Sequence, residues 1–525
     1  MQSKIERFVS ELRGAAPACG ILTEQKALQL YSTDIFWRAD APAAAAVLPL
    51  EQDHVIAALR VAHNCGLNIV PRGAGVSYTK GYLPAVPETV VIDTSKMKKV
   101  IEVREQDGFV RVEAGCTWAD VAEAVEAVGY STGYRGPFSG LIATVGGAVS
   151  QNSGGFGSAR HGTVAECVLG LAVVLADGRL LKTGSAARIG ARPFSRANGP
   201  DLTGLFIGDN GAFGVKTEIA LRMRRKPEHA GFASFGFSDL QTIANAQCEL
   251  ARTESIVSSF GFDRLKGELA TRSMRVKEGA ETLLNVARSD RSLISGLATA
   301  ARLAVGGLAF LSDHAYTLHV SVESDSAASL KSNLENIHKL CKSLGGYELP
   351  NSVPLALQAK PFNPLRGMLG PDGERWVPVH GLFPLSAAAD VIADWGRFES
   401  LHAGALASRG IRMSLLTMTV GYEFFLEPAF YWEDELYPIH TAVLGKAVTA
   451  PWHGRSENSA ITDYVGGLRG ELQDMFASLG GVSWQVGRDY PFREILEPDY
   501  YRALKDIKSA LDPRHAINPG ALGFD

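Results

Sequence analysis

The sequence is poor in cysteine and nearly balanced in charge. Its six cysteines are scattered over 525 residues, and no two of them form a Cys-x-x-Cys pair. This spacing disfavours a disulfide framework or a zinc site and predicts a reducing, cytoplasmic compartment. The formal net charge of −4 gives no overall positive field, so we do not expect nucleic acid as a partner.

The sequence also lacks two nucleotide-binding fingerprints. In residues 71–80 (PRGAGVSYTK), Tyr78 takes the third glycine position of a G-x-G-x-x-G motif, and a G-x-x-x-x-G-K-[ST] motif occurs nowhere. These absences disfavour a simple dinucleotide-binding fold and a P-loop NTPase. The first residues, MQSKIERFVSELRG, have no apolar core segment and predict an amphipathic helix in place of a signal peptide.

One long apolar run, LISGLATAARLAVGGLAFL, spans residues 293–311 and carries Arg302 at its centre. A central arginine is costly in lipid, so we predict a buried or interface helix. The alternatives are a peripheral membrane surface or a face that docks a partner chain, and a homo-oligomer is left open.

The pattern of apolar residues predicts an α+β protein of two domains, since 525 residues are too many for one core. Strands are expected at residues 45–48, 67–70, 89–93, 109–113, 167–175, 179–182 and 219–223. Helices are expected at residues 53–64, 118–128 and 498–511. Helical periodicity dominates from residue 240 to 342, and strand-like runs at 316–322 and 413–420 interrupt the second half.

Glycine is concentrated in three stretches. Residues 142–162 (IATVGGAVSQNSGGFGSARHG) hold six glycines and no acidic residue. Each glycine in a regular element costs roughly 0.5–1 kcal/mol relative to alanine. Residues 71–80 and 201–223 show the same enrichment. Close approach of the backbone to a large anionic ligand would offset this cost, because glycine lets backbone amides converge without Cβ clashes.

Together the three stretches resemble the flavoprotein superfamily that includes vanillyl-alcohol oxidase, p-cresol methylhydroxylase, the glycolate oxidase flavin subunit and D-lactate dehydrogenase. The motifs that carry the resemblance are P-R-G-x-G-x-S at 71–77, T-V-G-G-x-x-x-x-N-x-x-G at 144–155, G-x-x-G-[IV] at 211–215 and N-P-G at 518–520. The resemblance implies bound FAD. It also implies an FAD-binding domain built from residues 1–225 and 485–525, with a cap or substrate domain over 226–484.

The same resemblance indicates which residues hold the cofactor. The expected set is Pro71, Arg72, Gly73, Ala74, Gly75, Val76, Ser77, Tyr78, Gly140, Thr144, Gly146, Gly147, Ser150, Asn152, Gly154, Gly157, His161, Gly162, Gly211, Gly214, Val215 and Asn518. Such a set fits a long diphosphate that needs several backbone stretches to satisfy its polar atoms.

Covalent attachment of the flavin is not expected. Some members of the superfamily fix the flavin through a histidine just after the first glycine loop, where this chain has Val76 and Tyr78. His161 could contact FAD, or it could cap the turn in which it lies. Tyr422 is the nearest remaining candidate for a covalent bond, and we favour non-covalent FAD.

Five residues of the later segments are candidates for chemistry: His380, Glu427, Arg488, Tyr490 and Arg493. His380 lies between two prolines and could present a fixed imidazole as a base, or be a hydrogen-bonded core histidine. Glu427 lies in an aromatic run, where desolvation would raise its pKa and suit a base; the alternative is a structural acid paired with Arg455 or Arg488. The aromatic run itself is expected to be a packed strand.

Arg488, Tyr490 and Arg493 precede the last expected helix. In the phenol-oxidising members of the superfamily that the chain resembles, a Tyr–Arg pair in this vicinity holds the phenolate, and in the 2-hydroxy-acid members an arginine holds the carboxylate. The resemblance therefore implies that these residues hold a substrate anion, for which arginine is suited; the alternative is a surface charge cluster. His380, His453 and Glu457 show no metal-site spacing, and the G-H-x-G-D-G-N-x-H motif common in the glycolate and D-lactate branch is missing. We expect no metal.

The resemblance implies an FAD-dependent oxidoreductase, an oxidase or dehydrogenase. We expect it to oxidise the C–H of a small alcohol or 2-hydroxy acid by hydride transfer to the flavin, with oxygen or another electron acceptor as the second substrate. A para-substituted phenol as substrate is the first alternative. A flavin-binding electron-transfer or partner subunit with no substrate of its own is the second.

Overall fold

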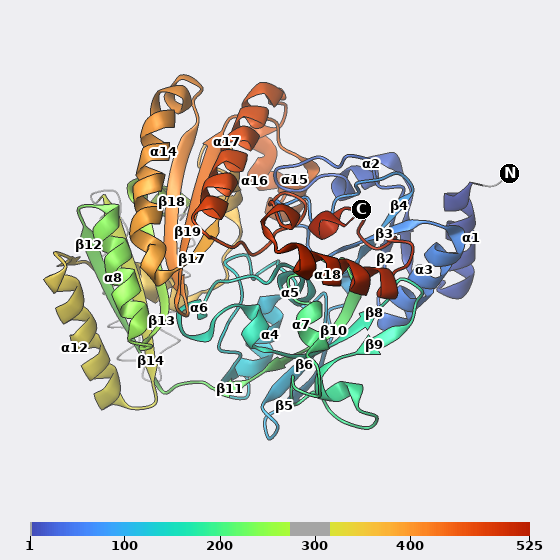
Figure 1. Ribbon diagram of the computed structural model, residues 1–525, viewed down its shortest axis with the longest axis horizontal. Helices are drawn as coiled ribbons and strands as arrows, with labels where there is room; N and C mark the ends of the chain where they lie inside the picture. The colour runs from blue at the N-terminus through green and yellow to red at the C-terminus, as the bar shows by residue number, and fades with distance from the viewer. Residues whose placement is uncertain (1–2, 274–314, 525) are drawn as a thin grey trace.

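The computed structural model describes residues 3–273 and 315–524. Sheets of four, five and eight strands, together with a small two-stranded one, carry the described strands, and helices cover them (Figure 1). The run at 293–311 lies outside the described residues. Within the described ranges, no helix has both the length and the apolar character to cross a membrane.

The four-stranded sheet has the order β1 (Gly20–Leu22), β2 (Ala45–Leu48), β4 (Thr89–Asp93), β3 (Asn68–Arg72). Strands β2, β4 and β3 are parallel, so β2 and β3 need a crossover, which α3 (Gln52–Cys65) provides. Helix α1 (Lys4–Ala15) begins with a capping box and packs on α3. Strand β3 ends where the first glycine stretch begins.

The five-stranded sheet is antiparallel, with the order β5 (Val100–Arg104), β6 (Phe109–Glu113), β10 (Val215–Arg222), β8 (Val168–Val174), β9 (Leu180–Lys182). Every residue of β8 is buried, which explains its unbroken apolar sequence. The helices of this part are α4 (Trp118–Glu126), α5 (Val145–Gln151), α6 (Ser158–His161) and α7 (Leu202–Leu205).

The eight-stranded sheet is antiparallel and forms the second half of the molecule (Figure 1). Its strands are β15 (Tyr347–Glu348), β12 (His229–Phe237), β14 (Tyr316–Ser324), β13 (Ile256–Asp263), β18 (Arg412–Val420), β19 (Glu423–Trp432), β16 (Arg375–Pro378) and β17 (Gly381–Pro384). The described helices of this half are α8 (Leu240–Arg252), α9 (Arg264–Ser273), α12 (Ala327–Ser343), α13 (Ser352–Ala359), α14 (Ala388–Ser408), α15 (Pro438–Leu444), α16 (Lys446–Thr449) and α17 (Ser459–Ser478).

The two faces of the large sheet belong to different cores, because side chains alternate along a strand. Leu415 packs in the core that contains the apolar residues of α8 and α14. Leu416, Met418 and Phe425 pack in the core of the five-stranded half, together with Trp484. The second face therefore lies against the glycine-rich part of the chain.

Most of the expected elements are present, and one expectation is wrong. The expected helical stretch from 240 to 342 contains β13, whose sequence IVSSFGFD is rich in β-branched and aromatic residues and pairs with β14 and β18. The aromatic run forms β19, a strand as expected. Helix α18 (Pro498–Leu511) has the expected bounds. The domain boundaries at 225 and 485 stay predictions.

Candidate active site

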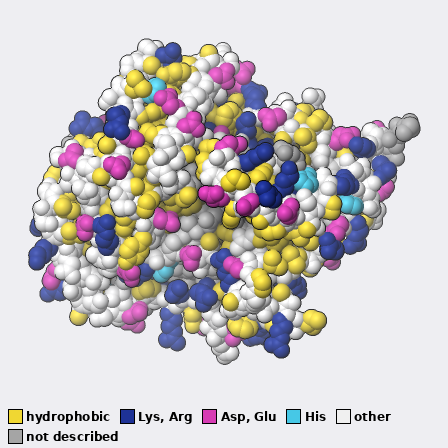
Figure 2. Space-filling model, viewed as in Figure 1, with side chains coloured by type: hydrophobic (Ala, Val, Ile, Leu, Met, Phe, Trp, Pro, Cys, Tyr) yellow, Lys and Arg dark blue, Asp and Glu magenta, His cyan; other side chains and the backbone are white. Residues whose placement is uncertain are grey.

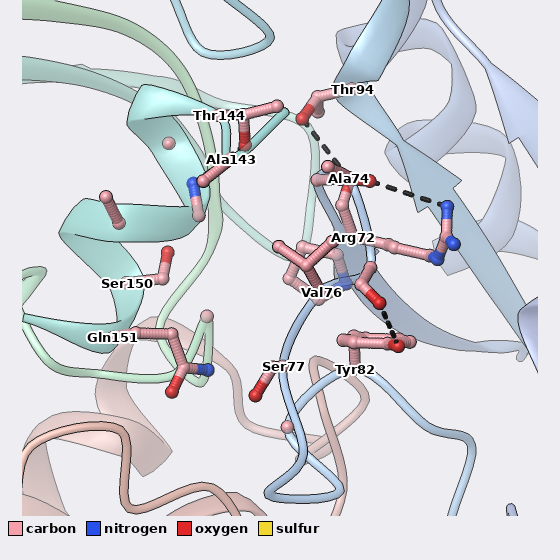
Figure 3. Close-up of a pocket in the computed structure, with 18 of the residues that line it drawn as sticks. Arg72, Ala74, Val76, Ser77, Tyr82, Thr94, Ala143, Thr144, Ser150 and Gln151 are labelled. Carbon is pink, nitrogen blue, oxygen red and sulfur yellow. Dashed lines mark hydrogen bonds between the residues drawn. The ribbon is translucent and has the colours of Figure 1, made fainter. Parts of the chain in front are cut away.

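A deep cavity lies between α5 and the segment that follows β3 (Figure 3). It contains about 880 Å³ of space not filled by protein atoms, part of it open to solvent. All three glycine stretches contribute to its wall, although they are far apart in the sequence. The picture shows Ser150 and Gln151 of α5 facing Val76 and Ser77 across the gap.

The first glycine loop is held by buried polar contacts. Arg72 ends β3 and forms a buried ion pair with Asp93 at 3.0 Å, and Tyr82 donates a hydrogen bond from its hydroxyl to the Gly75 carbonyl at 2.6 Å. Gly75 has a φ of +75°, and a Cβ there would lie 2.2 Å from the Arg72 guanidinium. Only glycine fits this position without displacing Arg72.

The second wall begins at Thr144, which caps α5. Its hydroxyl accepts a hydrogen bond from the Gly147 N–H at 3.1 Å, and a Cβ on Gly73 would lie 2.3 Å from the same oxygen. The first and second glycine stretches therefore touch at this point. A Cβ on Gly146 would meet Ala114 at 2.8 Å, so this glycine seats α5 on the five-stranded half.

The chemistry of the lining fits an elongated anion. Arg72 and Lys216 are its charged side chains, and no carboxylate is among the described residues that form it. Lys216 is buried against Asp209 at 2.6 Å. Two buried atoms, Arg72 Nε and Gln151 Oε1, have no partner within the described chain. Buried polar atoms are normally paired, so an unpaired donor and acceptor at the cavity fit a ligand that carries both kinds of group, as FAD does.

Fourteen of the twenty-two expected cofactor residues line this cavity. They are Pro71, Arg72, Gly73, Ala74, Gly75, Val76, Ser77, Thr144, Gly146, Gly147, Ser150, Gly211, Gly214 and Val215. Sequence reasoning missed Tyr82, Gln151, Lys216 and Gln485, which also line it. Glutamine and lysine are common on any surface, so no sequence signal distinguishes these positions.

The other eight expected residues lie outside the lining. Gly140, Gly154 and Gly157 are packing positions, where a Cβ would lie 2.2 Å from Phe362, Trp484 and the Gly133 carbonyl, respectively. Tyr78 is buried edge-on to Trp376.

Three of these eight residues shape the chain near the cavity. Asn152 ends α5 in a left-handed conformation, and Gly162 likewise ends α6 with a positive φ. Asn518 is buried and donates hydrogen bonds to the Gly81 and Asn210 carbonyls, both in residues that line the cavity. The N-P-G segment thus ties two parts of the wall together.

His161 and Tyr422 are not among the residues that line the cavity. His161 lies on α6, and burial together with three nearby arginines lowers its pKa to about 4. Tyr422 is exposed in the turn between β18 and β19 and donates a hydrogen bond to Glu254. Non-covalent FAD stays our prediction.

A second group of side chains is formed around His380, which is fully buried. It adjoins the cavity through the chain: Tyr78 follows the lining residues Val76 and Ser77, and Trp484 precedes the lining residue Gln485. The Trp484 backbone N–H donates to His380 Nε2 at 3.1 Å, and the Tyr490 hydroxyl lies 3.1 Å from His380 Nδ1. The His380 backbone N–H also donates to the Tyr490 hydroxyl oxygen at 3.0 Å.

These contacts fix the protonation of His380. Burial and the nearby Arg469 lower its pKa to about 3, so the ring is neutral. A backbone N–H can only donate, so Nε2 is the acceptor and we assign the ring proton to Nδ1. Nδ1–H then donates to Tyr490, whose oxygen accepts two hydrogen bonds. The Tyr490 O–H must point elsewhere, and His380 has no free site for a substrate proton.

Glu427 is the stronger candidate for a base. Burial raises its pKa to about 7, and Lys266 on α9 lowers it by a smaller amount. Phe425, two residues before Glu427 on β19, stacks on the His380 ring with centroids 5.6 Å apart, so Glu427 lies on the same side of the strand. Its charge contributes to the raised pKa values of Tyr78 and Tyr490. Neither Arg455 nor Arg488, the partners considered from the sequence, is the group that acts on it.

Arg469 is a member of this group that the sequence reasoning missed. It is buried on α17, donates to Asp489 at 2.6 Å and to the Pro378 carbonyl, and keeps Nη1 without a partner in the described chain. The signal was present: Arg469 falls on the apolar stripe formed by Val465, Leu472 and neighbouring residues of the helix. A charged residue on such a stripe indicates a buried role.

Arg488 and Arg493 contact the last segment of the chain. Arg488 donates to the carbonyls of Leu83 and Pro519, so it holds the last segment against the first half. Arg493 is exposed, with its guanidinium over the Tyr501 ring. His453 bonds Thr449, and no group of three metal-ligating side chains occurs in residues 3–273 and 315–524.

Comparison with known proteins relates the first half of the chain to FAD-binding proteins. A family model described as FAD binding domain matches residues 43–184. A probable mitochondrial D-lactate dehydrogenase of Danio rerio is 29% identical over 247 residues, which cover 47% of this chain and 48% of that protein. Glycolate oxidase subunit GlcD of Bacillus subtilis is 31% identical over 199 residues, or 38% of this chain and 41% of that protein. The matched segments thus span less than half of these relatives.

Solved structures match over nearly the whole chain. p-Cresol methylhydroxylase with substrate bound has a TM-score of 0.73 at 18% identity, covering 100% of this chain and 98% of that one. 4-Ethylphenol oxidase from Gulosibacter chungangensis has a TM-score of 0.68 at 16% identity, covering 99% and 97%. The expected α+β fold class and the expected FAD are thereby confirmed. Residues 43–184 thus match an FAD binding domain model, and the chain shares the fold of the p-cresol methylhydroxylase structure.

Proposed function

We propose that this chain is an FAD-dependent oxidoreductase that oxidises the C–H of a small alcohol or 2-hydroxy acid. The observation that carries the proposal is the contact of Tyr490 with His380, near Glu427, in a group whose chain neighbours Ser77 and Gln485 line the cavity. No carboxylate is among the described residues of that lining. Bound FAD would supply the acceptor for a hydride. The relatives named above carry lactate and glycolate in their names, which supports a 2-hydroxy acid as the first candidate.

The residues of the chain have separate tasks in this proposal. Tyr490 donates its O–H to an oxygen of the substrate, since its own oxygen already accepts two hydrogen bonds from His380. Glu427 accepts the hydroxyl proton, and its pKa of about 7 suits a base at neutral pH. Trp484 and Phe425 stack with their rings 4.9 Å apart and exclude water from the His380 side.

A para-substituted phenol is the second candidate. Two buried tyrosines, Tyr78 and Tyr490, and the unpaired Nη1 of Arg469 would suit a phenolate oxygen, because each offers a donor. The names of the two matched structures, p-cresol methylhydroxylase and 4-ethylphenol oxidase, support it.

Anaerobic reduction separates the candidates. The FAD-loaded protein is mixed without oxygen with D-lactate, glycolate, D-2-hydroxyglutarate or vanillyl alcohol, and loss of flavin absorbance is followed. Bleaching by a hydroxy acid supports the first candidate, and bleaching only by the phenol rejects it. Reduction by none of these compounds, with reoxidation of the chemically reduced flavin through a partner protein, would favour an electron-transfer subunit. Reoxidation by air or by a dye then shows whether oxygen is the acceptor.

A further inference from the structure

The segment between β9 and α7 carries a basic loop, residues 184–196 (GSAARIGARPFSR). Figure 1 shows this segment at the lower edge of the molecule, below the five-stranded sheet. The loop holds three arginines, and no acidic residue occurs from Gly178 to Pro200. The cavity described above and the His380 group contain none of these residues.

Hydrogen bonds at its base give the loop a fixed conformation. The Ser185 N–H donates to the Ser195 carbonyl at 2.8 Å, and the buried Ser185 hydroxyl donates to the Arg192 carbonyl at 2.6 Å. At the tip, the Ala191 N–H donates to the Arg188 carbonyl at 3.0 Å, and Gly190 has a φ of +76°. This is a hydrogen-bonded turn with glycine at its third position.

The turn presents a large apolar side chain to solvent. Ile189, its second residue, is 101% exposed, and Phe194 is 57% exposed. Leu180 and Leu202, at the two ends of the segment, are exposed as well. Four of the fourteen exposed large apolar side chains among the described residues thus lie within 23 residues. Nothing in the fold requires an isoleucine side chain to be exposed to solvent on this hydrogen-bonded turn.

The charged side chains of the loop itself are all basic, and Lys182 and Arg192 share a surface hollow with Glu102 and Glu218. Arg192 pairs with Asp107, and Arg196 pairs with Asp201. In residues 3–273 and 315–524, Arg188 and Lys182 have no acidic side chain within 4 Å. Figure 2 shows dark blue and yellow side chains next to one another at the lower edge of the molecule, where Figure 1 places this segment.

We propose that the basic loop docks the protein on an anionic lipid bilayer. Ile189 and Phe194 enter the boundary between headgroups and acyl chains, while Arg188 and Lys182 contact lipid phosphates. Apolar side chains flanked by basic ones are the chemistry that binds such a surface. A protruding turn suits a bilayer better than a folded partner, because a partner must offer a matching hollow for Ile189. This inference is independent of the proposed redox function.

Vesicle co-sedimentation tests the proposal with the full-length, FAD-loaded protein. The vesicles contain phosphatidylcholine alone or phosphatidylcholine mixed with phosphatidylglycerol. We expect binding to the mixed vesicles and little to phosphatidylcholine alone. Ile189→Asp should lower binding to the mixed vesicles about ten-fold or more, because it removes one buried apolar side chain. Arg188→Glu should lower it at low salt, and added salt should reduce the difference from the unchanged protein.

Leu401→Asp is the matched control, because Leu401 is 74% exposed on α14, outside the basic loop. Retained flavin absorbance confirms that each variant is folded. Equal binding to both vesicle types, no binding at all, or equal losses for Ile189→Asp and Leu401→Asp would overturn the proposal. A different outcome is that the unchanged protein does not bind vesicles and that Ile189→Asp changes the sedimentation coefficient in the absence of lipid. This outcome would indicate that the loop is a contact between copies of this chain.

Discussion

The substitution Gly147→Ala should lower the affinity of the protein for FAD without lowering the stability of the apoprotein. Gly147 lies in the first turn of α5 and lines the cavity. A Cβ at this position would lie 3.0 Å from Thr144 Oγ1 and would meet no other heavy atom within 4 Å. The methyl group therefore points into the space that the cofactor is expected to fill.

The magnitudes follow from this geometry. An alanine in a helix is favoured over glycine by roughly 0.5–1 kcal/mol, and the contact with Thr144 takes back part of that gain. The apoprotein should therefore be unchanged or slightly stabilised. A methyl group forced into a filled site costs about 1–3 kcal/mol, which corresponds to a loss of about 5- to 150-fold in FAD affinity.

Two measurements on the same samples check this prediction. Thermal unfolding of the apoprotein gives the stability, and quenching of flavin fluorescence during titration gives the dissociation constant for FAD. Gly467→Ala is the control, since Gly467 is exposed on α17 and a Cβ there meets nothing within 4 Å. An unchanged FAD dissociation constant in Gly147→Ala would refute the placement of the cofactor along α5.

Four further predictions concern the second group and the fold. Glu427 has a pKa raised by burial to about 7, so the rate of flavin reduction should rise with pH through about 7, and Glu427→Gln should abolish that rise in stopped-flow measurements. Because the pKa of Glu427 is raised in the folded protein, the neutral carboxyl stabilises the fold at low pH, and this contribution to the free energy of unfolding is lost as pH rises through about 7. Glu427→Gln should reduce this pH dependence in denaturation experiments. An unchanged dependence of the unfolding free energy on pH would count against a buried Glu427. Tyr490→Phe should lower kcat/KM about 10- to 100-fold, because a hydrogen bond to a charged group contributes about 1.5–3 kcal/mol; an unaltered kcat/KM would exclude Tyr490 from substrate binding. Asp434→Asn leaves the buried Arg375 without its partner at 2.9 Å and should cost about 3–5 kcal/mol of unfolding free energy, measured by urea denaturation; a change below 1 kcal/mol would show that the pair is solvated.

The glycine stretches could be predicted from the sequence because their glycine-rich motifs can be recognised there directly. Gly73 and Thr144 lie in contact across the cavity, and both belong to motifs that stand out in the chain. The strands were predictable where apolar runs were short and bounded by turns, as in β8. Strand β13 was missed because its pairing partners, β14 and β18, lie far along the chain.

The second group could be predicted only in part. His380, Glu427 and Tyr490 stand in unusual local sequences, and the fold brings them into one neighbourhood. Their roles depend on atoms that no pattern specifies. The Trp484 backbone N–H donates to His380 Nε2, so that nitrogen is not available to accept a substrate proton. For this reason we assign the base to Glu427 in place of His380. Arg488 was expected at the substrate and instead holds the last segment.

The central claim is that the three glycine stretches form one binding cavity for FAD, and a titration of the apoprotein with FAD tests it most directly. We predict that one equivalent of FAD stays with the protein through gel filtration, with the visible absorption bands of bound flavin, and that bulky substitutions such as Gly147→Leu abolish this retention. A protein that remains colourless after reconstitution, or a Gly147→Leu variant that retains flavin as fully as the unchanged chain, would contradict the account.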